Sequence, residues 1–253
     1  MYKKIILGAL ISAVFATSSF AETAASPEVA ALGDKLKPIF GDKPDSIKPS
    51  PVAGIYEVNF GPETLYVSAD GRYFFSGDLI DGQTRTNLTE NARTEGRKSE
   101  MAKVNASDTV EFKAKGTEKH VLSVFTDVDC PFCVKLHNEV PKLNEAGITV
   151  RYFGYPRSGI GTASYKKLVN IWCADNRQEA MTKAKRGETV ATKDCDNPVA
   201  KEFELGQRIG VNGTPALVTD AGIMIPGYRT AAELVKILDD IKAGDKSAAT
   251  AVN

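Results

Sequence analysis

The chain has 253 residues, of which 42% are hydrophobic, and its 32 lysine and arginine side chains balance 32 aspartate and glutamate side chains. This formal net charge of zero argues against a nucleic acid or an anionic membrane surface as the partner. The length allows one or two domains, and the pattern along the chain favours two.

The first 21 residues have the pattern of a secretory signal peptide. Lys3 and Lys4 precede an apolar stretch over residues 5–15, and small residues ending at Ala21 provide a cleavage site. The apolar stretch is shorter than the roughly 20 residues that a membrane-spanning helix needs. We therefore expect an exported protein with no membrane insertion, and in a bacterium export leads to the oxidising periplasm.

Residues 22–86 are predicted to form a small, β-rich N-terminal domain. Alternating apolar runs at residues 54–60, 65–68 and 73–76 indicate strands, with a hairpin-turn signal at Asp70-Gly71. A β-rich unit of this size has only a marginal core of its own. We therefore expect it to pack on the rest of the chain or to pair with a second copy of itself.

Residues 87–107 are polar and charged, and we interpret them as a helical linker between the two domains. Asn87, with Glu90 three residues later, resembles a capping box at a helix start. Gly96 weakens this interpretation, because glycine inside a helix costs about 1 kcal/mol relative to alanine. A flexible charged linker is the alternative.

Residues 108–245 are predicted to form the second domain, whose central motif is Cys130-Pro131-Phe132-Cys133. The run 121–125 is typical of a buried strand, and residues 133–146 are typical of a helix. Cys130 therefore lies at a helix N-terminus, where unpaired N–H groups and the helix dipole stabilise a thiolate. We expect Cys130 to be the low-pKa, solvent-reachable thiol that attacks disulfides, and Cys133 to be the more buried resolving thiol.

A structural disulfide and a zinc site are the alternatives for this cysteine pair. A tight ring at a helix start favours a reducible bond over an inert one. Zinc commonly needs a second close pair of ligands, and the chain has no second CxxC motif. His137 could be a third ligand, but a histidine at that position is expected to be a solvated surface residue. No metal is therefore predicted.

The order of the predicted elements is that of a thioredoxin-like α/β domain with helices inserted in its middle. A strand is expected at residues 148–155, helices at 164–174, 177–186 and 198–209, and a strand hairpin at 216–225. Thr230 with Glu233 forms a capping box for a final helix. The small, polar tail at residues 246–253 is expected to be flexible.

Two further features of this domain carry chemistry. Cys173 and Cys195 are the only other cysteines, and the exported context favours a structural disulfide between them. Gly213-Thr214-Pro215 precedes a predicted strand, where the thioredoxin-like context makes the Thr214-Pro215 bond a candidate cis peptide.

Several motifs together point to one family. They are Pro51-Val52-Ala53-Gly54, Phe125-Thr126-Asp127, Cys130-Pro131-Phe132-Cys133, Gly147-Ile148-Thr149-Val150-Arg151-Tyr152, Ile171-Trp172-Cys173-Ala174, Gly213-Thr214-Pro215-Ala216 and Pro226-Gly227-Tyr228. In these motifs the chain resembles the DsbC/DsbG family of periplasmic disulfide isomerases, over nearly all of its mature length.

The resemblance implies a thioredoxin-like catalytic domain, a helical linker and an N-terminal dimerisation domain, assembled as a V-shaped homodimer around an uncharged apolar cleft. It implies that Cys130 and Cys133 isomerise or reduce misoxidised exported proteins without a cofactor. The extended substrate would pair with the backbone of Thr214 beside cis-Pro215. Because this activity requires reduced Cys130, a membrane reductase of the DsbD kind is the implied partner.

Two positions differ from related proteins. Family members carry Gly-Tyr or Pro-Tyr between the two cysteines, whereas this chain has Pro131-Phe132, which leaves the balance of isomerase, reductase and oxidase activity open. Val124 stands where thioredoxins have a buried acid that assists proton transfer. Asp127 and Arg157 are candidates for that role, with a structural ion pair as the alternative.

Two alternative functions remain beside disulfide isomerisation. One is a dimeric holdase chaperone with a secondary redox role, and the other is a DsbG-like reductase of oxidised single cysteines. A DsbA-like oxidase is disfavoured by the extra N-terminal domain.

Overall fold

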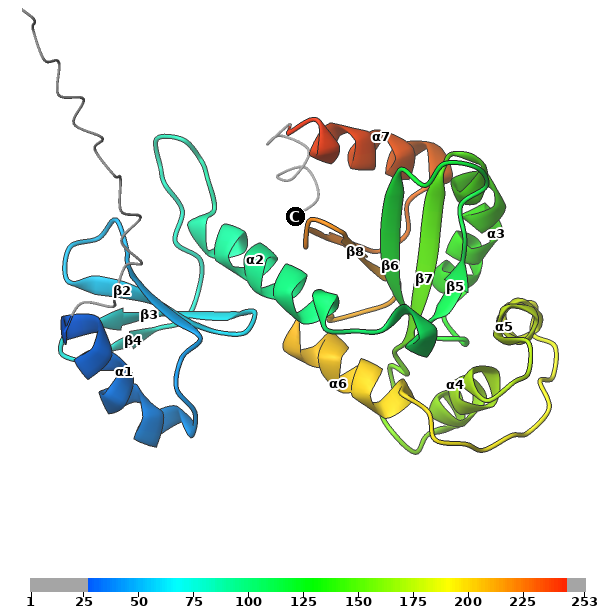
Figure 1. Ribbon diagram of the computed structural model, residues 1–253, viewed down its shortest axis with the longest axis horizontal. Helices are drawn as coiled ribbons and strands as arrows, with labels where there is room; N and C mark the ends of the chain where they lie inside the picture. Colours follow the sequence, from blue (N-terminus) through cyan, green and yellow to red (C-terminus); the bar gives the residue numbers. More distant parts are fainter. Residues whose placement is uncertain (1–26, 245–253) are drawn as a thin grey trace, which may run out of the picture.

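The computed structural model of the protein describes residues 27–244. The signal peptide predicted at residues 1–21 and the tail predicted at residues 246–253 lie outside the described residues. Within them, two β-sheets are joined by one long helix, α2 (Leu88–Ala102), which runs between them in Figure 1. No helix of this described part is long and apolar enough to cross a membrane.

The N-terminal sheet has four antiparallel strands in sequential order, accompanied by one helix. Its elements are α1 (Pro27–Phe40), β1 (Ser46–Pro49), β2 (Ile55–Phe60), β3 (Glu63–Ser68) and β4 (Phe74–Phe75). The last three strands match the three that the sequence predicts. Sequence reasoning missed α1 and β1, because α1 contains a proline and buries only two side chains, and β1 is four residues long.

A small core holds α1 against this sheet. Leu32 and Leu36 lie four residues apart, so they share one face of the helix. Both side chains are buried against Val58, Leu65 and Val67 from β2 and β3. The spacing of two leucines therefore fixes the position of a helix that the sequence pattern alone did not reveal.

The predicted hairpin turn at Asp70-Gly71 joins β3 to β4. Asp70 Oδ1 accepts a hydrogen bond from the backbone N–H of Arg72 at 3.0 Å, and the Gly71 N–H donates to Ser68 O at 2.8 Å. Gly71 has a φ of 75°, in the left-handed region that glycine adopts without steric cost.

Helix α2 begins at the predicted cap, where Asn87 Oδ1 accepts a hydrogen bond from the Glu90 N–H at 2.9 Å. The Glu90 carboxylate binds Arg97, so the capping box forms in one direction only. The helix continues through Gly96, and the flexible-linker alternative is therefore wrong. A Cβ at position 96 would lie 2.6 Å from Gly61 O, so glycine is needed for the close approach of the turn between β2 and β3.

Helix α2 also packs on the C-terminal part of the chain. Arg97 Nε donates to Gly222 O at 2.9 Å, and a Cβ at Gly222 would lie 2.2 Å from Thr94 O. Met101 and Val104 pack against an apolar cluster of the second sheet. The polar and charged linker therefore has one buried face, on which Arg97 is only 4% exposed.

The second sheet has the strand order β5-β7-β6-β8-β9, in which β6 and β7 are parallel and the other neighbours antiparallel. The elements are η1 (Ala106–Asp108), β5 (Val110–Phe112), β6 (His120–Thr126), α3 (Pro131–Glu145), β7 (Ile148–Gly154), α4 (Ala163–Trp172), α5 (Arg177–Lys185), α6 (Val199–Arg208), β8 (Ala216–Thr219), β9 (Met224–Pro226) and α7 (Ala231–Lys242). The strands and helices that the sequence predicts form in the predicted order, whereas η1 and β5 are additional elements that the sequence did not predict. Helix α7 begins with both bonds of the predicted capping box at Thr230.

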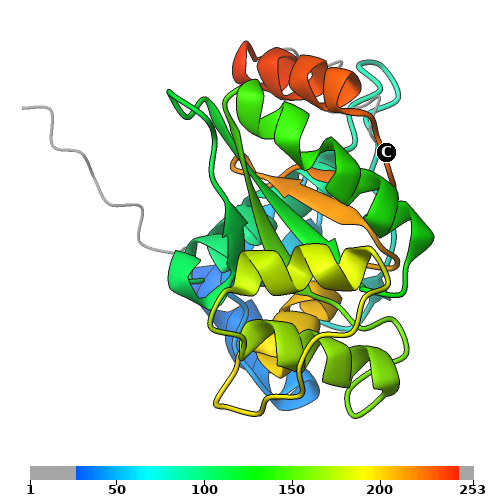
Figure 2. The same ribbon diagram turned by 90° about the vertical axis from the view of Figure 1, so that its right-hand side faces the viewer.

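The central strands of this sheet are buried on both faces. On β6, Leu122 and Val124 belong to a large apolar cluster with residues of α3 and α7, whereas Phe125 belongs to a smaller cluster with residues of α6. On β7, Tyr152 and Phe153 divide between the two clusters in the same way, as the strand period of two requires. Figure 2 shows α7 (red) lying along α3 (green) over the sheet. The buried strand β6 leads directly into the cysteine motif.

Candidate active site

The Cys130-Pro131-Phe132-Cys133 motif lies where β6 passes into α3. Cys130 is the N-cap residue of α3, with φ −86° and ψ 117°, and Pro131 occupies the first turn. Proline suits this position because its missing N–H would have no partner in the helix. The helix begins two residues earlier than the sequence predicted, so both cysteines are held by it.

The surroundings of Cys130 favour its thiolate. Burial by itself raises the pKa of the thiol, but the neighbouring Thr214 side chain, the N–H and thiol of Cys133 and the N–H of Phe132 hold the pKa below its ordinary value. In the protonated form Cys130 Sγ also donates to Thr214 O at 3.1 Å, a contact that opposes ionisation. The groups that stabilise the thiolate outweigh it.

Cys133 has the opposite behaviour. Its residue is 0% exposed, and burial raises the pKa of its thiol above the ordinary value. The positive charge of Lys185, the Thr126 hydroxyl and the Asp127 N–H act against this shift without reversing it. Two sulfurs in one helical turn thus differ in the direction of their pKa shifts.

The expectation that Cys130 is solvent-reachable is wrong for this structure. Cys130 is only 1% exposed, almost as buried as Cys133. The Thr214 backbone lies against its sulfur, and a partner disulfide therefore has to displace that contact to reach it. The two thiols differ in electrostatic surroundings rather than in exposure.

The loop that faces Cys130 contains a cis peptide bond between Thr214 and Pro215. Pro215 immediately precedes β8, and its carbonyl accepts a hydrogen bond from the Gly227 N–H at 2.8 Å. The predicted substrate-binding residues Thr214 and Pro215 therefore lie beside the predicted nucleophile, although 84 positions separate Thr214 from it in the chain.

Asp127 and Arg157 form an ion pair, with 3.3 Å between Asp127 Oδ2 and Arg157 Nε. Asp127 also accepts hydrogen bonds from Ser164 Oγ at 2.7 Å and from the N–H groups of Asp129 and Arg157. Burial raises the pKa of Asp127, but these bonds and the Arg157 charge lower it below its ordinary value. A carboxylate with so many donors favours the structural alternative over a role in proton transfer.

Lys185 is a residue of this site that sequence reasoning missed. It is the last residue of α5, and its Nζ donates to Thr126 Oγ1 at 2.7 Å and to Asp127 O at 2.9 Å. No pattern in the sequence points to Lys185, because a lysine near the C-terminus of a polar helix ordinarily faces water and complements the helix dipole.

The expectation for His137 is also wrong, because the side chain is buried rather than solvated. Its Nδ1 is 3.0 Å from Tyr152 Oη and its Nε2 is 3.1 Å from Thr182 Oγ1. Burial, reinforced by the charges of Lys185 and Arg186, lowers the pKa of His137 to about 4. The imidazole is therefore neutral at physiological pH and belongs to the core. Among the described residues, no group of three or more His, Cys, Asp or Glu side chains is arranged to hold a metal ion.

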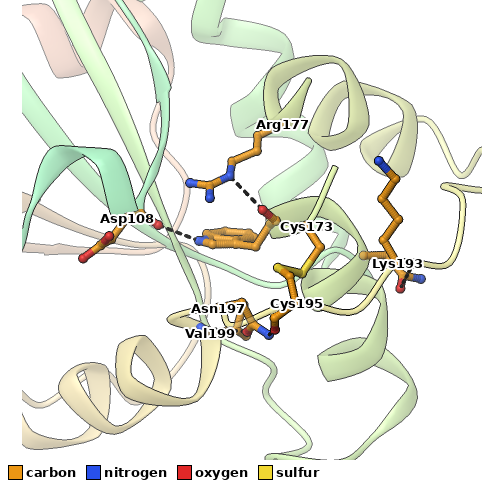
Figure 3. The surroundings of a disulfide bond; sticks show 9 residues. Asp108, Cys173, Arg177, Lys193, Cys195, Asn197 and Val199 are labelled. Atoms are coloured by element: carbon orange, nitrogen blue, oxygen red, sulfur yellow. Dashed lines mark hydrogen bonds between the residues drawn. A yellow bond between two sulfur atoms is a disulfide. The ribbon is translucent and has the colours of Figure 1, made fainter. Parts of the chain in front are cut away.

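Cys173 and Cys195 are joined by a disulfide, with their Cα atoms 5.7 Å apart (Figure 3). The bond connects the C-terminal end of α4 to the segment that leads into α6. Beside it, Trp172 Nε1 donates to Asp108 O at 2.9 Å and Arg177 Nε donates to Trp172 O at 2.7 Å. The disulfide therefore lies in a region of the inserted helices that is also tied to the start of the second domain.

Two family models match this chain. The thioredoxin-like domain model covers residues 108–242, and the model of the disulfide bond isomerase protein N-terminal domain covers residues 23–90. Together with a cysteine pair at the head of α3, these matches place the chain in the class of thioredoxin-like proteins that carry the N-terminal domain of disulfide bond isomerases.

Curated relatives narrow this class. The chain is 37% identical over 206 residues to the thiol:disulfide interchange protein DsbC of Dickeya dadantii, covering 79% of this chain and 83% of that protein. It is 36% identical over 244 residues to the protein of the same name from Salmonella typhimurium, covering 95% and 97%. A crystal structure of a disulfide interchange protein from Neisseria gonorrhoeae is 33% identical with a TM-score of 0.49, covering 54% of this chain and 97% of that chain. The chain belongs to the DsbC family, as its motifs indicated.

Proposed function

We propose that this DsbC-family protein is a periplasmic enzyme that isomerises or reduces incorrect disulfides in exported proteins. The observation that carries the proposal is the opposite direction of two pKa shifts, downward for Cys130 and upward for Cys133. The Cys130 sulfur therefore ionises more readily and attacks first, while Cys133 stays protonated until the second step. The two thiols supply the two electrons of the reduction, so the exchange needs no cofactor.

In the first step the Cys130 thiolate attacks one sulfur of the substrate disulfide. A bond forms between Cys130 Sγ and that sulfur, and the substrate S–S bond breaks. The second substrate sulfur leaves with the bonding electron pair as a thiolate, which can take a proton from water. The result is a mixed disulfide at the N-terminus of α3.

Two outcomes follow from the mixed disulfide. If another substrate thiolate attacks the substrate sulfur, Cys130 leaves as a thiolate and the substrate has exchanged one disulfide for another. If Cys133 attacks Cys130 Sγ instead, the substrate leaves with both sulfurs reduced and the enzyme is oxidised. The ratio of these two rates decides between isomerisation and reduction.

The substrate is proposed to lie along the loop at Thr214 and Pro215. The contact between Cys130 Sγ and Thr214 O, at 3.1 Å, would be replaced by pairing of an extended substrate segment with the Thr214 backbone. Phe132 and Ile160 are 54% and 49% exposed, large fractions for apolar side chains. Phe132 lies inside the cysteine motif itself and would contact apolar side chains of an unfolded substrate.

We propose a homodimer that forms through the N-terminal domain at residues 22–86, with residues 87–107 as linker and residues 108–245 as catalytic domain. Strand β4 is an edge of the N-terminal sheet, and its Phe75, with neighbouring Tyr73 and Ile80, is exposed. An apolar sheet edge is a surface that pairs readily with another chain.

The proposed dimer is tested by sedimentation of Phe75→Glu. The charge should yield monomers that keep their thiol chemistry, while Ile39→Glu, an equally exposed apolar position on α1, should remain dimeric. Dimers of both variants, or monomers of the unaltered protein, would contradict the assignment.

A reducing partner and a compartment complete the proposal. The predicted signal peptide supports a periplasmic location, and repeated turnover requires a DsbD-like membrane reductase to return Cys130 to its thiol form. Thiol trapping in periplasmic extract tests both points. Mostly reduced Cys130 supports isomerase or reductase activity, whereas mostly oxidised Cys130 supports an oxidase.

The activity itself is tested with scrambled ribonuclease in a redox buffer. The unaltered protein should restore ribonuclease activity, and Cys130→Ser should restore none above buffer. Cys133→Ser is the informative companion, because it keeps the attacking thiol and should form a trapped mixed disulfide with substrate. Equal recovery with Cys130→Ser would rule out the assignment of the nucleophile.

A holdase chaperone is the second candidate, favoured by the exposed Phe132 and Ile160. A cysteine-free client separates the two functions, because it offers no disulfide. Suppression of its aggregation by Cys130→Ser/Cys133→Ser at the level of the unaltered protein would make binding the primary function. The third alternative, a DsbG-like reductase, is tested with a client that carries one oxidised cysteine. Reduction of that cysteine by the unaltered protein, but not by Cys130→Ser/Cys133→Ser, would support it.

A further inference from the structure

The ammonium of Lys185 is enclosed by protein next to the cysteine pair. The residue is 3% exposed, and its two hydrogen-bond acceptors, Thr126 Oγ1 at 2.7 Å and Asp127 O at 2.9 Å, are uncharged oxygens. Both belong to the segment that leads from β6 to Cys130. A buried positive charge is costly unless a negative charge compensates it. An anion is therefore expected to lie close to the Lys185 ammonium.

The carboxylates near Lys185 already have cations of their own. The charged or titratable groups that act on it are Cys133, Asp127, Cys130 and Asp129, and Lys185 in turn acts on His137, as does its neighbour Arg186. Asp127 pairs with Arg157, and Asp129 pairs with Lys167 at 2.6 Å. His137 is neutral at physiological pH. In the mixed disulfide Cys130 carries no charge, so the sulfur of Cys133 is the remaining group of the site that becomes an anion without a cation of its own.

A single hydroxyl connects the two groups. Thr126 Oγ1 accepts a hydrogen bond from Lys185 Nζ, and the same side chain lowers the pKa of the Cys133 thiol. A hydroxyl can accept one bond and donate another at the same time. With the ammonium on its lone pair, the Thr126 O–H is oriented to donate to a thiolate.

We propose that Lys185 is a positioning residue for the resolving step, in which its buried charge, relayed by the Thr126 hydroxyl, stabilises the Cys133 thiolate that attacks the mixed disulfide. This inference rests on the proposed function, in which Cys133 is the resolving thiol. It gives the site a group that favours deprotonation of the buried cysteine, although Val124 stands at the position where thioredoxins have a buried acid.

The step balances without a further reactant. Cys133 releases its proton to water, the thiolate electron pair forms the bond from Cys133 Sγ to Cys130 Sγ, and the bond from Cys130 Sγ to the substrate sulfur breaks. The substrate sulfur leaves with that electron pair and takes a proton from water. Lys185 acts as an ammonium in this step and exchanges no proton with the cysteines, and although burial lowers the pKa of its side chain, the charges of Cys133 and Asp127 raise it.

The test uses DTNB, an aromatic disulfide whose released thiolate is coloured, with the reduced full-length protein. Attack by Cys130 releases the first thiolate in a phase that depends on reagent concentration. Attack by Cys133 on the Cys130 mixed disulfide releases the second in a phase that does not. Stopped-flow mixing across a pH series therefore measures the rate of attack by Cys130 and the rate of attack by Cys133 separately in one reaction.

Lys185→Met removes the charge at similar side-chain length and is expected to slow mainly the second phase, because Lys185 interacts more strongly with Cys133 than with Cys130. A nearby opposite charge changes a pKa by about 1–3 units, so the pH at which the second phase is half-maximal should rise by about 1 unit or more. A higher pKa leaves less Cys133 thiolate at neutral pH, but each thiolate is then more nucleophilic. The net result is that the second phase should slow by about threefold for each unit by which the pKa rises. The rate and pH profile of the first phase should change less than those of the second.

Two companion variants separate charge from structure. Lys183→Met is the matched control, since Lys183 lies on the same helix but is exposed and paired with Glu179 at 2.8 Å; it should leave both phases unchanged. Thr126→Val keeps Lys185 and removes the relay, and it should shift the second phase in the same direction as Lys185→Met. Thr126→Val also serves as the test if Lys185→Met does not fold.

The outcomes distinguish this inference from the function on which it rests. An unchanged second-phase pH profile in folded Lys185→Met, or in Thr126→Val, overturns the role of Lys185, as does an equal change in both phases. If the unaltered protein itself releases only one thiolate per chain, Cys133 does not resolve the mixed disulfide and the proposed mechanism fails instead.

Discussion

The carboxyl of Glu202 is hydrogen bonded to the backbone of Gly154, with 2.6 Å between Glu202 Oε2 and Gly154 N. This bond fixes α6 to the end of β7, next to the strand that leads to the active site. Glu202 Oε1 is buried and has no hydrogen-bond partner within residues 27–244. Burial raises the pKa of Glu202 to about 8, against the hydrogen bond from Gly154 and the effect of the neighbouring Trp172, which both lower it. The carboxyl is therefore largely protonated at neutral pH.

Glu202 should make the protein less stable as pH rises. Its folded pKa of about 8 lies above the ordinary 4.5, so the folded state holds the extra proton between these values and stability falls as pH rises through this range. His137 acts oppositely, but only between about 4 and its ordinary 6.5. From pH 6.5 to 8 we expect Glu202 to lower the free energy of unfolding by up to about 1.4 kcal/mol per pH unit.

Urea unfolding of the unaltered protein and Glu202→Gln at pH 6.5 and 8 measures this contribution. Glutamine keeps the shape of the neutral acid and cannot ionise, so the variant should lose this part of the slope. The cysteines titrate in both proteins, so their contribution cancels when the two slopes of unfolding free energy against pH are compared. Equal slopes would mean that Glu202 does not titrate in this range.

Gly96→Ala is expected to destabilise the protein although alanine is the better helix former. Its Cβ would lie 2.6 Å from Gly61 O and 2.7 Å from Pro62 Cα, both backbone atoms that cannot move alone. Overpacking of this kind costs about 1–3 kcal/mol. Urea unfolding of the full-length chain gives the change directly.

Gly33→Ala is the matched control for this prediction. Gly33 also lies inside a helix, but its added Cβ would lie 3.4 Å from the flexible end of Ile47. The helix propensity of alanine should therefore stabilise this variant by up to about 1 kcal/mol. Stabilisation by both substitutions would contradict the close packing of α2 against the turn between β2 and β3.

Alkylation after mild reduction should label the four cysteines in a fixed order. Cys130 should react first, because its lowered pKa supplies thiolate at neutral pH even though the residue is 1% exposed. Cys133 should follow more slowly because its pKa is raised. Cys173 and Cys195 should stay unlabelled until the protein is denatured, as mass spectrometry of the peptides can establish. Earlier labelling of Cys133 would reverse the roles of the two thiols.

Cys195→Ala should lower the free energy of unfolding by about 2–5 kcal/mol without altering the chemistry of the folded fraction. The disulfide closes a loop with a sequence separation of 22 residues, and its loss frees the unfolded chain. The two phases of the DTNB reaction provide the functional control. Loss of either phase in a folded variant would instead identify Cys173 and Cys195 as a redox relay.

The sequence by itself determined the features that depend on near neighbours in the chain. A CxxC motif between an apolar run and a helical pattern places Cys130 at a helix N-terminus, because these elements are adjacent. The caps at Asn87 and Thr230 form at the predicted residues for the same reason, since each spans three positions. The length of a helical turn is enough to specify them.

Only the tertiary structure decided the features that bring distant segments together. Lys185 reaches Thr126 across 59 positions, and His137 reaches Thr182 across 45, so neither burial can be read from the helix on which the residue lies. The burial of Cys130 likewise depends on Thr214, which the chain supplies 84 positions later. Burial sets the direction of the Cys133 and His137 pKa shifts and opposes the downward shift at Cys130. Desolvation is a property of the assembled fold, because it depends on every segment that excludes water from the group.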